Sequence, residues 1–288
     1  MKQKIIWGQF LLIIVLFLLL LMIVTNTNGI GSLIIRKLDA TDLVYLDYGD
    51  QFAGVEMVDT EGEIAELHTH EKYTVVTYLS SSCSSCIKVL ADFNRFSYVF
   101  GDSLEYRILW LDEIPFAYVD KYSVDRSINF SLSGKVKIST STPTFYILDE
   151  NGKVVFRDIS RENLITKLIN LQLVPIDTLI VNANEYICKN LYKANSVKDK
   201  LIYFYMPGCP DCEAANSVLS EIKLEDQFDI KYVYKYDTTD SSKVIDYDKL
   251  FASIYDITWY PSFLVLSDNG YRIIGKMPID EIIDEIIR

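Results

Sequence analysis

One arrangement of residues occurs twice in this chain and limits its possible folds more than any other feature. In each copy, a run of β-branched and aromatic residues ends at a Cys-x-x-Cys pair: residues 73–79 precede Cys83 and Cys86, and residues 201–205 precede Cys209 and Cys212. Such a run predicts a buried strand. Apolar residues at helical spacing follow each pair, so each pair is expected where a strand gives way to a helix.

The repeat continues downstream of each cysteine pair. Thr142-Pro143 opens an apolar run that ends at Asn151-Gly152, and Tyr260-Pro261 opens one that ends at Asn269-Gly270. Asn-Gly after an apolar strand predicts a tight hairpin, because both residues tolerate positive φ. A return strand and an amphipathic helix then close each copy. These helices are expected to begin near Ser160 and Pro278.

Strands interleaved with helices at this spacing predict the α/β fold class. We expect two central mixed sheets with flanking helices, in two blocks that meet near residues 173–177. Residues 49–62 add a strand, a turn and a strand before the first cysteine pair.

The cysteine pairs carry the chemistry that the sequence predicts. A cysteine at a helix N-terminus is stabilised as a thiolate by free N–H groups and the helix dipole, which makes its sulfur nucleophilic. Cys83 and Cys209 are therefore expected to attack a substrate disulfide, and Cys86 and Cys212 to resolve the mixed disulfide. Zinc binding and structural disulfides are the alternatives. Zinc-binding pairs lie about 15–20 residues apart, whereas over a hundred residues separate these two.

Both blocks resemble proteins with the thioredoxin fold. The resemblance covers about residues 41–170 and 175–288, and it depends on Cys-x-x-Cys combined with Pro-[Ser/Thr]-Phe, the following hairpin and the duplication. In the first block, G-D-x-F-x-G-V-x-x-V-D-x-x-G is similar to the membrane-tethered redoxin and TlpA/ResA/MauD-like proteins. We therefore expect two tandem thioredoxin-like domains, at 41–172 and 175–288, of which the second is closer to a plain thioredoxin module.

The resemblance also implies roles for the two proline segments. In thioredoxin-like proteins this proline lies opposite the active-site sulfurs with a cis peptide bond, and the nearby backbone can pair with a substrate peptide. We accordingly expect cis bonds at Pro143 and Pro261. Substrate binding is expected at Thr142, Pro143, Tyr260 and Pro261.

The chain departs from the family at two kinds of position. Thioredoxin has a buried acid six residues before its first cysteine, where this chain has Thr77 and Tyr203. The residues between the cysteines are Ser84-Ser85 and Pro210-Asp211, without the histidine of strongly oxidising relatives. An inward-pointing Asp211 would disfavour a thiolate and make the second site lean toward a reductant. The redox direction stays open.

The N-terminal sequence predicts a membrane anchor. Residues 10–24 are an unbroken apolar run that residues 5–7 extend to about twenty, enough to cross the ~30 Å hydrocarbon core. A cleaved signal peptide is the alternative, although no A-x-A pattern follows the run. We expect a cytoplasmic tail at 1–4, a transmembrane helix at 5–24 and a tether at 25–40. The protein would be single-pass in the cell membrane, with extracytoplasmic catalytic domains.

The net charge of the chain and its resemblance to thioredoxin-fold proteins together limit the functions that we expect. The net charge of −12 argues against nucleic acid, because an acidic chain repels phosphate backbones. We expect a thiol–disulfide oxidoreductase acting on exported proteins or peptides, without metal or any cofactor beyond the redox-active disulfides Cys83–Cys86 and Cys209–Cys212. Because the anchor contains no cysteine, a separate redox partner must regenerate the sites.

Two other functions compete with this one. A thiol peroxidase of the redoxin type is the first, but Val76 and Ser80 stand where peroxiredoxins carry proline and threonine before the reactive cysteine. The second is a non-catalytic tethered module that assists the maturation of secreted peptides.

The remaining polar residues have simpler interpretations. Cys188 is expected to be a buried structural thiol on a helix, with a redox or intermolecular link as the alternative. His68 and His70 are expected in a solvated turn rather than at a metal. Acidic side chains expected to face solvent are Asp112, Glu113, Asp149 and Glu150.

Overall fold

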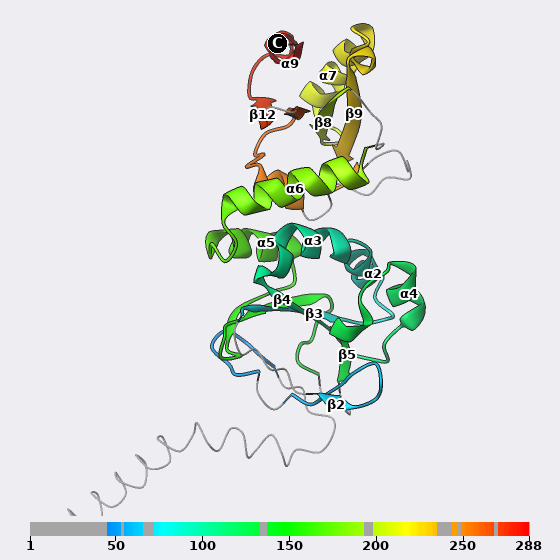
Figure 1. Cartoon of the computed structure of the whole chain (residues 1–288), viewed down its shortest axis with the longest axis vertical. Coiled ribbons are helices and arrows are strands. Elements are labelled where there is room, and N and C mark those ends of the chain that lie inside the picture. The colour runs from blue at the N-terminus through cyan, green and yellow to red at the C-terminus, as the bar shows by residue number, and fades with distance from the viewer. Residues whose placement is uncertain are drawn as a thin grey trace, which may run out of the picture.

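The computed structural model describes residues 45–52, 55–65, 72–132, 137–192, 198–234, 244–246, 249–267 and 270–287. Within these residues two β-sheets, each with its own helices, are stacked along the long axis of the molecule (Figure 1). The expected tail, anchor and tether, and both histidines, lie outside the described residues. None of the helices in the described ranges combines the length and hydrophobicity that a membrane crossing needs.

The first sheet has seven strands in the order β2-β1-β5-β4-β3-β6-β7 within the described chain. Three neighbouring strands are parallel: β5 (Asn129–Leu132), β4 (Glu105–Trp110) and β3 (Thr74–Leu79). The others are antiparallel to their neighbours: β6 (Thr144–Leu148), β7 (Val154–Asp158), β1 (Met57–Val58) and β2 (Ile64–Ala65). All six residues of β3 are buried, in keeping with its run of β-branched and aromatic residues.

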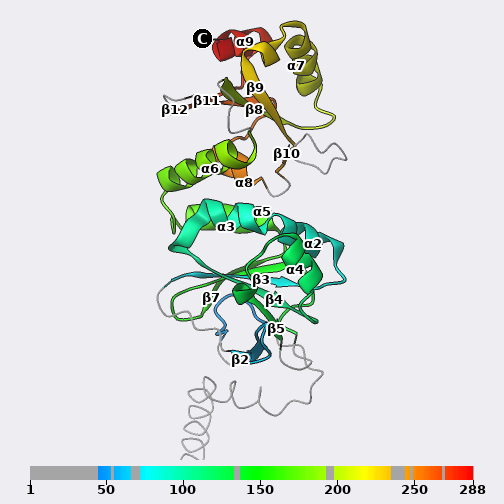
Figure 2. The ribbon, with the colours of Figure 1, turned by 45° about the vertical axis from the view of Figure 1, so that its right-hand side comes forward.

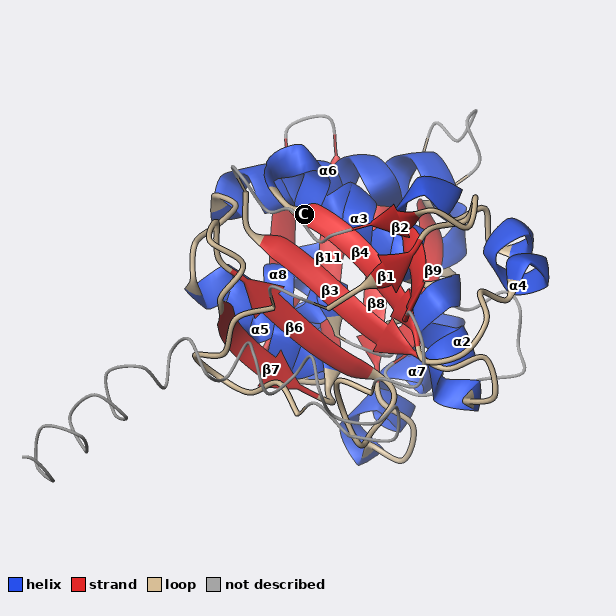
Figure 3. Cartoon of the chain, turned by 90° about the horizontal axis from the view of Figure 1, so that it is seen from below, coloured by secondary structure: helices blue, strands red, loops and turns tan. Residues whose placement is uncertain are grey.

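Helices flank the first sheet, as Figure 3 shows in a view along the long axis. They are α2 (Ser84–Ala91), α3 (Phe93–Phe100), α4 (Phe116–Lys121) and α5 (Arg161–Asn170), with the short 3-10 turns η1 (Gly101–Ser103) and η2 (Arg126–Ile128). The predicted helix after Cys86 is broken at Asp92 into α2 and α3. Ser160 caps α5 as predicted, because its side chain accepts a hydrogen bond from the Asn163 N–H.

The second sheet repeats this arrangement on a smaller scale, with the order β10-β9-β8-β11-β12 in the described residues. Its parallel strands are β10 (Val244–Ile245), β9 (Phe228–Tyr234) and β8 (Asp199–Tyr205), and its antiparallel strands are β11 (Ser262–Ser267) and β12 (Gly270–Gly275). The helical elements are α6 (Ile176–Asn190), α7 (Pro210–Glu221), η3 (Leu224–Asp226), α8 (Leu250–Ile254) and α9 (Ile279–Ile287). In both sheets the strand before the cysteine pair lies between one parallel and one antiparallel neighbour.

The two units meet through helices. Figure 2 shows α6 and α8 facing α3 and α5, and one apolar cluster contains buried residues from both sides, including Phe96, Phe100, Ala183 and Phe251. The Asn182 side chain donates to the Val99 carbonyl over 2.9 Å. The interface is therefore an extended, largely apolar helix-on-helix contact.

Candidate functional site

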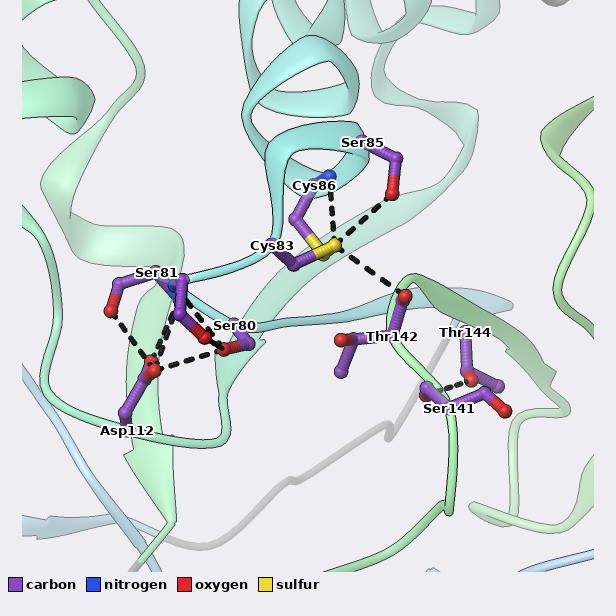
Figure 4. The surroundings of a disulfide bond; sticks show 10 residues. Ser80, Ser81, Cys83, Ser85, Cys86, Asp112, Ser141, Thr142 and Thr144 are labelled. Carbon is purple, nitrogen blue, oxygen red and sulfur yellow. Dashed lines mark hydrogen bonds between the residues drawn. A yellow bond between two sulfur atoms is a disulfide. The ribbon is translucent and has the colours of Figure 1, made fainter.

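The first cysteine pair lies where β3 passes into α2 (Figure 4). Cys83 is the N-cap of α2, and its sulfur accepts a hydrogen bond from the Cys86 N–H over 3.2 Å. The two cysteines form a disulfide. Cys83 is half-buried, whereas Cys86 is fully buried. Of the two sulfurs, a substrate can therefore approach that of Cys83.

The proline segment of the first block lies beside this sulfur. The Thr142–Pro143 peptide bond is cis, which confirms the prediction. The Cys83 sulfur is 3.5 Å from the Thr142 carbonyl oxygen, and both residues of the proline segment are half-buried. The fold thus brings Cys83 and Cys86 beside Thr142 and its cis bond to Pro143, from segments about sixty residues apart.

The second cysteine pair repeats the same geometry at the start of α7. The Cys209 sulfur caps the helix by accepting from the Cys212 N–H over 3.3 Å, and it lies 3.6 Å from the Tyr260 carbonyl oxygen. The Tyr260–Pro261 bond is cis, again as predicted. Here both cysteines are free thiols. Cys209 is 7 % exposed and Cys212 is fully buried, so at both sites the first cysteine is the more accessible one.

The buried thiol of the second site is held in its protonated form. Burial, followed by the hydrogen bond with the Cys209 sulfur, raises the pKa of Cys212 to about 12. The Tyr203 hydroxyl donates to the Cys212 carbonyl over 3.0 Å, and the Tyr203 ring stacks on Phe263. Burial also raises the pKa of Tyr203, so its phenol stays protonated at neutral pH and cannot serve as a base.

A pocket of about 330 Å³ adjoins the second site. Pro261 and Asp211 contribute to its lining, together with Trp259, Lys276 and Met277. Trp259 is 51 % exposed, which is unusual for so large an apolar side chain. The pocket is thus an accessible, mainly apolar surface beside the cis proline.

Asp112 was expected to face solvent, and this prediction was wrong. Asp112 follows β4 and is half-buried, where its carboxylate accepts hydrogen bonds from the Ser80 hydroxyl (2.9 Å), the Ser81 hydroxyl (2.9 Å) and the Ser81 N–H (3.0 Å). These serines form the turn that leads to Cys83 (Figure 4). β3 and β4 are parallel neighbours, so their carboxyl ends lie at the same edge of the sheet. This rule could have predicted that Asp112, which follows β4, lies near the serines that follow β3.

Other expectations for polar residues had mixed outcomes. Cys188 is exposed on α6, so the prediction of a buried thiol was wrong. Asp149 is half-buried and accepts from the N–H groups of Asn151 and Lys153, each over 2.9 Å, within the predicted Asn-Gly turn. Glu113 and Glu150 are exposed, as expected. Asp211 is exposed too.

One family of known proteins matches part of this chain by sequence. Residues 189–287 match the family described as thioredoxin-like domain. No protein with a curated function matches the chain by sequence.

Similar solved structures include the thioredoxin domain of a thiol-disulfide oxidoreductase from Bacteroides vulgatus (15% identity, 44% of this chain and 98% of that one, TM-score 0.36). A thiol:disulfide interchange protein from Bacteroides sp. is similar at 17% identity, over 43% of this chain and 91% of that one, with a TM-score of 0.33. A peroxiredoxin-like protein from Aquifex aeolicus is similar at 13% identity, over 46% and 96%, with a TM-score of 0.35. By sequence, the part of this chain from residue 189 to 287 matches the thioredoxin-like domain family.

Proposed function

We propose that this chain is a thiol–disulfide oxidoreductase with one Cys-x-x-Cys site in each of two tandem thioredoxin-like domains. One observation carries the proposal. At both helix starts, the more accessible sulfur accepts an N–H bond from the second cysteine and lies 3.5 to 3.6 Å from the carbonyl that precedes a cis proline. A disulfide that served only to staple the fold would not require this arrangement twice.

The geometry supports a two-step exchange at each site. In the reducing direction, the thiolate of Cys83 bonds to one substrate sulfur, the substrate S–S bond breaks, and the other substrate sulfur leaves with the electron pair and takes up a proton. Cys86, once deprotonated, then attacks Cys83 and forms the Cys83–Cys86 disulfide while the second substrate thiolate departs. Two electrons pass from the protein to the substrate. Cys209 and Cys212 have the same roles at the second site.

The proline segments are suited to hold the substrate chain. Thr144 and Ser262 are the first residues that β6 and β11 pair with the strands before the cysteines. Thr142 and Tyr260 lie two residues earlier, outside those ladders and beside the reactive sulfurs. An extended substrate peptide can therefore pair with backbone at these residues. This geometry supports the proposal that Thr142, Pro143, Tyr260 and Pro261 bind substrate.

The apolar N-terminal run supports a reaction that takes place at the outer side of the cell membrane. With a transmembrane helix at 5–24 and a tether at 25–40, the protein would be a single-pass protein of the cell membrane with both domains outside the cytoplasm. Its substrates would be cysteines of exported proteins or peptides. A separate partner, either a membrane protein or a soluble one, would restore the redox state of the two sites.

Insulin reduction by the full chain with dithiothreitol tests the proposal. Replacing either reactive cysteine (Cys83→Ser or Cys209→Ser) should lower the rate, and the double variant should show only the rate of dithiothreitol alone. Cys188→Ser is the matched control, because Cys188 is an exposed thiol outside both sites. A double variant as active as the parent protein would refute the proposed function.

A further inference from the structure

Ser85 contacts the reactive sulfur of the first site. Its hydroxyl oxygen lies 3.1 Å from the Cys83 sulfur, on the first turn of α2 (Figure 4). In the disulfide the Cys83 sulfur carries no hydrogen, so the hydroxyl is the donor in this contact. A thiolate likewise has no hydrogen to give, and the same hydroxyl can donate to it once the disulfide opens.

This contact adds a second donor to the one that the helix supplies. The Cys86 N–H already points at the Cys83 sulfur over 3.2 Å. Hydrogen bonds to a charged acceptor are stronger than those between neutral groups, so two donors stabilise a thiolate more than one. Ser85 is exposed, which leaves its hydroxyl free to follow the sulfur as the redox state changes.

The charged groups around Cys83 do not replace this donor. The proline segment at 139–143 and the turn at 80–82 contain no charged side chain. Asp112, at the end of β4, is negative and binds the serines of that turn. Lys88 lies on the next turn of α2 and is exposed. Within the described residues, Ser85 is therefore the residue whose side-chain hydroxyl contacts the Cys83 sulfur.

At the second site, a residue of different chemistry occupies the position of Ser85. The residue before its second cysteine is Asp211, an exposed side chain that lines the neighbouring pocket. An ionised carboxylate accepts hydrogen bonds but cannot donate one. Among the described residues, the Cys209 sulfur thus accepts from the Cys212 N–H, and the two otherwise matching sites differ at this position.

We propose that Ser85 is a further catalytic residue of the first site, which donates a hydrogen bond to the Cys83 thiolate and makes Cys83 the better nucleophile and leaving group at neutral pH. This inference rests on the proposed function and adds a role to it. It also separates the two sites, because the thiolate of Cys83 gains a stabilising contact that the thiolate of Cys209 does not have.

The test measures the ionisation of Cys83 directly. In the full chain with Cys86→Ala, the rate of Cys83 alkylation by iodoacetamide is followed from pH 5 to pH 10 by peptide-resolved mass spectrometry. Ser85→Ala should raise the midpoint by about one pH unit, the size expected for one charged hydrogen bond. Ser85→Thr retains the hydroxyl and should restore the midpoint. Ser84→Ala is the matched control, since Ser84 is also an exposed serine of the first turn.

Two results would overturn the inference: a midpoint unchanged in Ser85→Ala, or an equal shift in Ser84→Ala. Insulin reduction by the parent protein separates this failure from failure of the proposed function. If the parent is active but the midpoint does not move, the role of Ser85 is wrong and the oxidoreductase stands. If the midpoint moves but the parent is inactive, the hydrogen bond stands and the function does not.

Discussion

Replacing Arg95 should destabilise the contact between the two units strongly. Arg95, on α3 of the first unit, is 5% exposed and forms an ion pair with Asp92. Its guanidinium also lies 3.9 Å from Asp246, a buried carboxylate of the second unit. Asp246 in turn accepts from the N–H groups of Phe251 (3.2 Å) and Ala252 (3.0 Å) at the start of α8. One cation therefore faces two carboxylates at the interface.

The size of the effect follows from what Arg95→Met leaves behind. Methionine keeps much of the side-chain volume, but the buried carboxylate of Asp246 loses its ion pair with Arg95. Removing one partner of a buried ion pair costs about 3–5 kcal/mol. Asp246 keeps two backbone hydrogen bonds, and Asp92 is 31% exposed, so we expect the lower end, a loss of about 3 kcal/mol in the free energy of unfolding.

Urea unfolding followed by circular dichroism measures this loss. Arg126→Met is the matched control, because Arg126 also pairs with an aspartate, Asp120, but both side chains are more than half exposed. Solvent screens such a pair, and its removal should change the free energy of unfolding little. If the two variants lose the same free energy of unfolding, the buried charges stabilise the protein no more than the exposed pair does.

Three further predictions concern the sites. Only the Cys212 thiolate resolves a mixed disulfide, and burial raises the pKa of Cys212. Resolution measured by quenched flow should therefore accelerate steadily from pH 7 to 10, and a plateau near pH 8 would contradict this. Asp112→Ala removes the acceptor of three hydrogen bonds from the turn before Cys83, so it should lower the free energy of unfolding in urea by about 2 kcal/mol. It should also slow thiol–disulfide exchange at the first site, and equal slowing at both sites would contradict a local role. Tyr203→Phe should lower the free energy of unfolding by about 1 kcal/mol, because it removes the buried hydrogen bond to the Cys212 carbonyl. Tyr205→Phe should lower it less, since the Tyr205 hydroxyl bonds to the exposed Glu213. A larger loss in Tyr205→Phe would refute this ranking of the two hydrogen bonds.

The elements around both sites could be predicted because their signals are local. β3 and β8 are buried for most of their length, and runs of β-branched and aromatic residues are typical of such strands. The two cis prolines were predicted from the resemblance, since nothing in the residues alone distinguishes a cis from a trans bond. The first Asn-Gly turn matches its prediction, with Gly152 at a φ of +75°. The second turn lies partly outside the described residues.

The errors concern features that tertiary contacts decide. Leu90 and Phe93 continue one apolar stripe across Asp92, so spacing alone predicted a single helix where the structure has two. The position of Asp112 depends on the serines of a neighbouring strand's turn, which periodicity does not reveal. The wrong prediction for Cys188 could have been avoided from the spacing of apolar residues in this helix. The buried stripe of α6 is Leu179, Ala183 and Ile187, and the next residue points away from it.

Redox titration of both cysteine pairs tests the central claim most directly. The full chain is equilibrated in glutathione buffers, and the oxidised fraction of each pair is read by peptide-resolved mass spectrometry. Exchangeable sites should show midpoints above about −300 mV. If both pairs stay oxidised down to lower potentials, they are structural disulfides and the account of this chain as an oxidoreductase is wrong.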